Sequence, residues 1–116
     1  MRDAWSFDVV IAGSGMAGAA VAAALDNLGW RTLVVEPGLD SSKRLAGELI
    51  HPPGAADLAE LGLLGDLEAA GGTPVLGFAV IGDGQAHVLP YARVDGQRPT
   101  GFAMEHAAIA TTLRAA

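Results

Sequence analysis

The sequence VVIAGSGMAG, residues 9–18, decides the fold of this chain. A short β-branched run at residues 9–12 turns at Gly13 into an alanine-rich segment, which indicates a buried strand, a tight turn and then a helix. Gly29 stands where a helix-ending glycine is expected, and residues 32–35 (TLVV) form a second short apolar run. The stretch therefore predicts one βαβ unit with two parallel strands.

Three glycines in this stretch predict a dinucleotide site. Gly13, Gly15 and Gly18 have the spacing G-x-G-x-x-G, directly after the first strand and at the start of the helix. The first permits the turn, the second lets a pyrophosphate approach the backbone, and the third lets helix and strand pack closely. Glu36 ends the second strand, where a carboxylate binds ribose hydroxyls and repels a 2′-phosphate. The alternative is a glycine-rich turn that binds no nucleotide, with Glu36 a solvated strand end.

Composition narrows the function classes further. The chain has 116 residues, 51% of them hydrophobic, which describes a globular domain and not a disordered chain. Its net charge of −6 would repel phosphate backbones, so we expect no nucleic-acid partner. Helix N-terminal amides can still bind a phosphate. The chain has no cysteine and therefore no disulfide, and we expect it to be cytoplasmic.

Membrane and metal sites are not indicated. The apolar run at residues 9–25 is short for a membrane span and contains Ser14 and three glycines. His51, His87 and His106 share no metal-like spacing, so we expect no metal. No side chain has the pattern of an indispensable acid or base, and the catalytic residues stay unknown.

The rest of the chain predicts short helices and one hairpin. Residues 47–51 lead into a helix with Pro53 in its first turn. Two short helical pieces with a core-facing or interface stripe follow, because glycines interrupt the leucine series Leu58, Leu61, Leu64 and Leu67. The runs at residues 76–81 and 86–89 flank an Asp-Gly turn, which predicts a hairpin. A polar loop is expected at 94–100 and a helix at 104–116.

These elements predict an α/β fold that is incomplete without further chain. Two parallel strands and a hairpin are too little sheet to be stable alone. We expect a Rossmann-like domain from residues 1–72 and 101–116, with residues 73–100 as a hairpin that begins a second domain. The helix at 104–116 has no stop signal, so the expected partner is the remainder of the same protein, as a C-terminal part or a second chain.

A second stretch carries a family resemblance. Residues 44–63, RLAGELIHPPGAADLAELGL, are similar to the R-x-x-G-E-L-x-x-P-x-G-x-x-x-L-x-x-L-G-L segment of squalene epoxidases and bacterial polyether polyene epoxidases. Residues 77–91 and 106–116 are similar as well. The chain thus resembles the N-terminal portion of FAD-dependent monooxygenases of the aromatic hydroxylase class.

The resemblance implies FAD as a tightly held cofactor, NAD(P)H as reductant, and transfer of one oxygen atom from O₂ to an apolar polyene or polyketide substrate. The fragment alone would be inactive. Residues 1–72 and 101–116 would belong to the FAD-binding domain, and 73–100 would begin the substrate domain. The resemblance also implies a role for individual positions. Glu36 and Pro37 would line the ribose, Arg44 would face the cofactor, and Gly47 and Glu48 would shape a turn near the flavin. The pyrophosphate would be lined by Gly13, Gly15, Met16, Ala17 and Gly18.

The sequence departs from the family at one place and leaves alternatives open. Ala107 and Ala108 stand where the epoxidases have Gly-Arg, whose arginine contributes to FAD binding. Arg44 can also be read as a solvated loop cation, and Glu48 as a carboxylate that caps the approach to a helix. Other readings of the whole chain are a geranylgeranyl-reductase-like or halogenase-like flavoenzyme of the same superfamily, or a nucleotide-binding module without redox chemistry.

Overall fold

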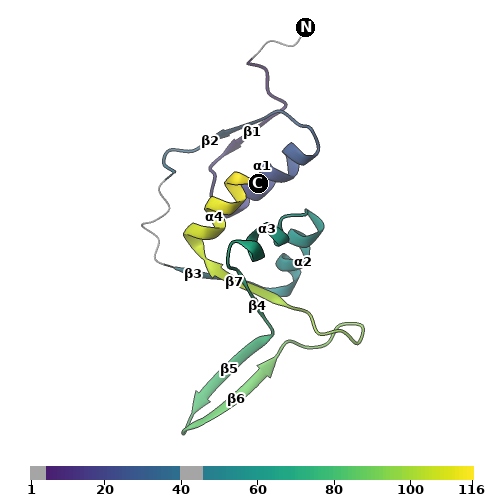
Figure 1. Ribbon diagram of the computed structural model, residues 1–116, viewed down its shortest axis with the longest axis vertical. Helices are drawn as coiled ribbons and strands as arrows, with labels where there is room; N and C mark the ends of the chain where they lie inside the picture. The colour runs from purple at the N-terminus through teal and green to yellow at the C-terminus, as the bar shows by residue number, and fades with distance from the viewer. Residues whose placement is uncertain (1–4, 40–45) are drawn as a thin grey trace.

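The computed structural model describes residues 5–39 and 46–116, which form an α/β fold of small sheets and short helices (Figure 1). Two regions are visible, a helical body with the βαβ unit and a hairpin that projects from it. In chain order the elements are β1 (Val9–Ala12), α1 (Met16–Asn27), β2 (Thr32–Val35), β3 (Gly47–Ile50), α2 (Pro52–Glu60), α3 (Leu64–Ala69), β4 (Thr73–Val75), β5 (Gly77–Gly82), β6 (Gln85–Pro90), β7 (Gly101–Glu105) and α4 (His106–Ala115).

The predicted βαβ unit is confirmed. Strands β1 and β2 pair in parallel, from Val9 opposite Thr32 to Ala12 opposite Val35. Helix α1 connects them and ends just before Gly29, whose φ of +77° is a conformation that glycine adopts readily. The β-branched residues suit both strands because each is short and packs against a helix.

A second sheet was not foreseen. Strand β7 lies in the middle of a three-stranded antiparallel sheet, with β3 on one side and β4 on the other. The prediction of a helix from residue 104 was therefore wrong at its start: residues 101–105 are a strand, and α4 begins at His106. Strand β7 is defined by partners distant in sequence, which hydrogen-bond to it on both edges, and no local period reveals such partners.

The Asp-Gly hairpin is confirmed. Strands β5 and β6 pair in register from Gly77 opposite Pro90 to Gly82 opposite Gln85. Asp83 and Gly84 both have positive φ, +51° and +75°, as the tightest two-residue hairpin turns require. The hairpin extends away from the helices (Figure 1), and several of its large apolar side chains are exposed: Phe78, Val80, Ile81, Val88 and Leu89.

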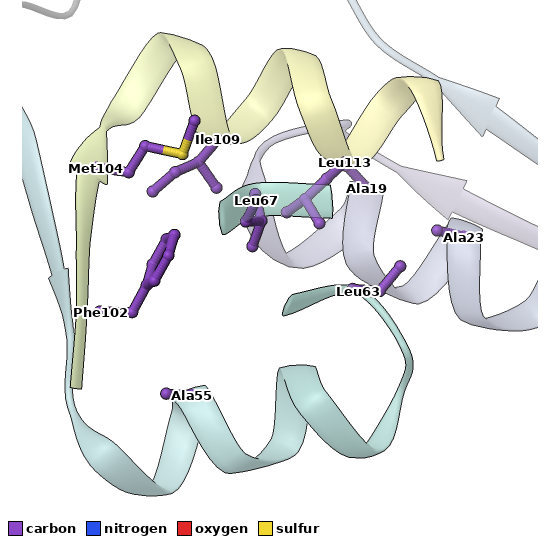
Figure 2. Close-up of a cluster of buried hydrophobic side chains, with 9 residues drawn as sticks. All are labelled: Ala19, Ala23, Ala55, Leu63, Leu67, Phe102, Met104, Ile109 and Leu113. Atoms are coloured by element: carbon purple, nitrogen blue, oxygen red, sulfur yellow. The ribbon is translucent and has the colours of Figure 1, made fainter. Parts of the chain in front are cut away.

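The core lies where α4 packs between α1 and α3 and against β7 (Figure 2). Phe102, Leu63, Leu67 and Ile109 are its largest fully buried side chains. Ala19 and Ala23 of α1 let α4 approach closely, because their side chains are short. The contacts of α4 with α1 hold the βαβ unit to the rest of the body.

The predicted leucine stripe is correct except at one position. Leu67 is fully buried, and Leu58 and Leu64 pack against the core, whereas Leu61 is 44% exposed. Gly62 has a φ of +75° and separates α2 from α3, so the helical phase does not continue through it. Leu63 takes the buried place that the spacing assigned to Leu61.

Leu67→Ala is predicted to lower the free energy of unfolding by about 2–5 kcal/mol, because it leaves a cavity among fully buried neighbours. Leu61→Ala is the matched control and is expected to cost about 1 kcal/mol or less, because that side chain is already largely in water. Urea unfolding of the two variants, followed by circular dichroism, measures the difference. Equal costs would contradict the assignment of Leu67 to the core.

Candidate nucleotide-binding site

The turn between β1 and α1 is built on backbone contact. Gly13 has a φ of +99°, and its N–H donates to the carbonyl of Val35 at 2.7 Å, which ties the turn to the end of β2. A Cβ atom on Gly18 would overlap the carbonyl group of Gly13, and it would lie in contact with the Ile11 side chain. The first and third glycines are therefore required by the fold itself for different reasons: Gly13 has a positive φ that other residues rarely adopt, and no residue larger than glycine fits at Gly18, where the helix crosses the turn.

The second glycine has a different environment. Gly15 is the residue before α1, with φ −67° and ψ −173°, and a Cβ atom added there would meet nothing within 4 Å. No side chain of the described residues caps α1, whose first turn is Met16, Ala17 and Gly18. The first amides of a helix lack intrahelical acceptors, and the helix dipole places partial positive charge there. An anion can therefore reach backbone donors at Gly15 without displacing a side chain.

Glu36 lies at the end of β2 and is fixed by two backbone donors. The N–H of Ser14 donates to its Oε2 at 2.7 Å, and the N–H of Gly38 donates to its Oε1 at 3.0 Å. These hydrogen bonds, the Ser14 bond foremost, hold the pKa of the Glu36 carboxyl below its usual value against an opposing effect of burial, and the Arg114 charge lowers the pKa further. The carboxylate is thus ionised and oriented at neutral pH.

Arg114, near the end of α4, reaches the same turn. Its Nε–H donates to the carbonyl of Ser14 at 2.8 Å, and its Nη1–H donates to the carbonyl of Leu39 at 3.0 Å. No role for this residue was predicted from the sequence. No local motif could have revealed the contact, because it joins residues separated by 100 positions.

A cavity of about 490 Å³ lies between α1, β2 and the end of α4. Small and apolar side chains form much of its wall, and Glu36 and Arg114 line it as well. Two hydroxyl oxygens on this wall, Ser14 Oγ and Thr32 Oγ1, are buried and have no hydrogen-bond partner within the described ranges. The cavity therefore has largely apolar walls, with the Glu36 carboxylate and the Arg114 guanidinium among its lining groups.

The other predicted site residues lie elsewhere. Arg44 is outside the described residues. Gly47 and Glu48 were expected in a turn, but they belong to β3 and pair with Glu105 and Met104 of β7, so the turn prediction was wrong. The antiparallel ladder with β7 keeps this segment extended.

Glu48 has a side-chain partner that the sequence did not indicate. Its Oε1 lies 2.8 Å from Nδ1 of His106, a residue 8% exposed at the start of α4. Ala107 and Ala108 belong to the first turn of α4, and Ala108 packs against the core. Because both residues are alanines, these two positions carry no cation. Pro37 is exposed directly after Glu36.

Two absences hold for the described part of the chain. No group of three or more histidine or acidic side chains there could hold a metal ion. No helix in that part is long and apolar enough to cross a membrane.

Comparison with known proteins connects this site to a class of enzymes. No protein-family profile matches the chain. A squalene epoxidase of Gibberella zeae is 31% identical over 92% of this chain and 25% of its own length. Squalene epoxidase 3 of Arabidopsis thaliana is 40% identical over 72% of this chain and 16% of its own length. The chain thus spans a quarter or less of these curated relatives.

Solved structures agree on the fold. PqsL of Pseudomonas aeruginosa, a probable FAD-dependent monooxygenase, matches 92% of this chain and 29% of its own with a TM-score of 0.71 and 28% identity. The p-nitrophenol 4-monooxygenase PnpA of Pseudomonas putida matches 90% of this chain and 27% of its own with a TM-score of 0.70 and 27% identity.

The βαβ fold, the glycine turn and these matches place the chain with the FAD-dependent monooxygenases of the aromatic hydroxylase class. Within that class, its sequence is similar to squalene epoxidases over most of its length.

Gly18→Ala is predicted to destabilise the protein by about 1–3 kcal/mol through overpacking against the Gly13 carbonyl. The sign of the stability change distinguishes the two effects, because alanine in a helix is otherwise favoured over glycine by about 1 kcal/mol. A loss of stability would therefore come from the steric overlap. Chemical unfolding of the variant and the parent gives the difference. A variant as stable as the parent would contradict the close crossing of α1 over the turn.

Glu36→Gln is predicted to change stability in a pH-dependent way. The lowered pKa means that ionised Glu36 stabilises the folded state above the pKa of the unfolded chain, and that this contribution is lost as pH falls through the folded-state pKa. The difference in unfolding free energy between parent and variant should therefore be largest near neutral pH and shrink in acid. Unfolding measured across a pH series tests this, with Glu60→Gln, at an exposed position of α2, as control for the loss of one charge. A difference that is constant with pH would contradict it.

Proposed function

We propose that this chain is the FAD-binding part of a flavoprotein monooxygenase that epoxidises an apolar polyene or polyketide substrate with NAD(P)H and O₂. The observation that carries the proposal is the joint geometry of the turn and the carboxylate. The open backbone at Gly15 forms the start of α1, where no side chain caps the helix, and Glu36 is held next to this turn by the N–H of Ser14. Both features belong to a chain similar to squalene epoxidases.

The residues at the turn fit the pyrophosphate of FAD. Gly13, Gly15, Met16, Ala17 and Gly18 would hold it with backbone N–H groups and the dipole of α1. This mode of binding uses no basic side chain, which reconciles an anionic ligand with a net charge of −6. The space at Gly15 is what a phosphate needs for close approach to the backbone.

Glu36 and Pro37 would hold the adenosine ribose. Each oxygen of Glu36 already accepts one backbone hydrogen bond, and a carboxylate has about four acceptor positions, so two stay available for hydroxyl groups. The same charge would repel a 2′-phosphate, which FAD does not carry. Arg44, Gly47 and Glu48 are proposed to lie toward the remainder of the cofactor.

When bound, FAD would supply the redox chemistry that activates O₂ and transfers one of its oxygen atoms. The described residues would contribute binding and orientation: the turn would fix the phosphates, and Glu36 would fix the ribose. A donor of the NAD(P)H type is proposed as reductant, in line with the resemblance to the family.

The substrate and the rest of the protein are inferred from the relatives. Proteins named squalene epoxidases match this chain, and they are at least four times as long as the segment matched. We infer that the remainder of the protein completes the fold and that the exposed apolar hairpin begins its substrate domain. From the cysteine-free composition alone, we infer that the protein is cytoplasmic. A purified complete protein that shows no flavin absorbance near ~450 nm, even after incubation with FAD, would overturn the proposal.

Product analysis distinguishes epoxidation from its alternatives. The complete protein is incubated with NADPH, O₂ and squalene, with and without halide, and the products are analysed by mass spectrometry. An epoxide formed without halide supports the proposal. A hydroxylated product from p-nitrophenol, the compound after which PnpA is named, would favour aromatic hydroxylation. Halogenated product would indicate a halogenase-like enzyme, saturation of double bonds a reductase, and FAD binding without turnover a non-catalytic module.

Gly15→Ala is predicted to weaken FAD binding by about tenfold or more, with a loss of stability of about 1 kcal/mol or less, because Gly15 is the N-cap of α1 and alanine is a poorer N-cap residue. The backbone at Gly15 is one that alanine adopts, and its Cβ atom meets no protein atom, but it would occupy the approach to the α1 amides. Fluorescence titration of the apoprotein with FAD measures the affinity. Gly65→Ala is the matched control, because its added Cβ atom also meets open space, on α3. Unchanged FAD affinity in Gly15→Ala would contradict a pyrophosphate at this turn.

A further inference from the structure

Arg114 connects three segments that are far apart in the sequence. Its guanidinium extends from the last turn of α4 to the turn after β1 and to the segment after β2, through the carbonyls of Ser14 and Leu39. The two hydrogen bonds, 2.8 and 3.0 Å long, have acceptors on different segments. A single side chain therefore fixes the distance between the two segments that carry the glycine turn and Glu36.

Ser14 is hydrogen-bonded both to Arg114 and to Glu36. Its carbonyl accepts from Arg114, while its N–H donates to Glu36 Oε2 at 2.7 Å. The residue is 5% exposed, so a lost partner on either side would not be replaced freely by water. The three residues form one continuous chain of hydrogen bonds, Arg114 to Ser14 to Glu36.

We propose that Arg114 is a positioning residue that holds the glycine turn and Glu36 in the arrangement that receives the nucleotide end of FAD. The inference rests on the proposed function. It adds a residue that acts through Ser14 and Glu36, because the hydrogen bonds of Arg114 go to the backbone carbonyls of Ser14 and Leu39.

An arginine suits this position better than a lysine. The planar guanidinium directs two N–H groups along fixed directions to two carbonyls, whereas an ammonium is a point charge on a flexible stem. Arg114 also lies in the last turn of α4, where a cation is favoured by the helix dipole. The N–H groups of Ser14 and Gly38 are the main causes of the lowered pKa of Glu36, and the Arg114 charge lowers that pKa further.

The test uses the complete protein as apoprotein, in four forms: parent, Arg114→Met, Arg114→Lys and Arg93→Met. Methionine keeps much of the length of the side chain and removes its donors. Arg93→Met is the matched control, because Arg93 also donates to a carbonyl, that of Gly96 at 2.8 Å, in an exposed loop. Two quantities are measured, the Kd for FAD by fluorescence titration and the hydrogen exchange of a peptide that contains Ser14.

Arg114→Met is expected to raise the Kd for FAD by about tenfold, the equivalent of one hydrogen bond to a charged group, and to accelerate exchange at Ser14. Arg114→Lys should recover part of both losses, and Arg93→Met should match the parent. Thermal unfolding of the apoproteins identifies a variant that is globally unfolded, in which case Arg114→Lys carries the test.

The outcomes separate this inference from the proposed function. A parent that binds no FAD overturns the proposed function, and exchange at Ser14 then decides alone whether Arg114 orders the turn. If the parent binds FAD and Arg114→Met binds it equally well, the inference is wrong, whatever exchange shows. Weaker FAD binding with unchanged exchange at Ser14 also overturns it, because Arg114 would then act by another route.

Discussion

The close crossing of helix α1 over the turn at Gly13 is the constraint on which the rest of the structure depends. Because Gly18 has no side chain, the helix starts almost in contact with the Gly13 carbonyl, and the N–H of Gly13 bonds to the end of β2. That geometry directs the uncapped end of α1 to the same edge of the sheet at which Glu36 ends β2. In parallel βαβ units the ligand sites lie at this carboxyl edge, so the fold and the site have one cause.

Distant parts of the chain make this local unit stable. Two strands and one helix bury little apolar surface alone. Helix α4 supplies the missing cover, since it packs its Ile109 and Leu113 toward the small residues of α1 and toward α3, as Figure 2 shows. Strand β7 leads directly into α4 and is itself held between β3 and β4. The position of Arg114 therefore follows from the antiparallel sheet, although that sheet contains none of the residues of the glycine turn.

Sequence predicted the features that local chemistry determines. The glycine spacing, the strand ends and the Asp-Gly turn each depend on neighbours within a few residues, and the structure confirms the βαβ unit and the hairpin. Strand β7 and the strand at Gly47 depend on partners more than 25 positions away, so a helical reading of Met104 and a turn at Glu48 were both reasonable and both wrong. The contacts of Arg114 with Ser14 and of His106 with Glu48 were missed for the same reason. The cofactor contacts of the predicted site residues stay predictions.

The net charge of the chain shows why composition is a poor guide to this site. A charge of −6 argues against a surface that attracts anions over long distances, yet the turn at Gly15 presents amide donors and a helix end within contact distance of a ligand. Arg114, a cation that the structure places at this turn, is hydrogen-bonded to two backbone carbonyls, so its side chain orders the protein. The pKa of Glu36 is lowered first by the Ser14 and Gly38 N–H groups, and the Arg114 charge adds to their effect. Affinity for an anionic cofactor would then come from oriented backbone dipoles at short range, which is why it depends on the placement of three glycines and not on the number of basic residues.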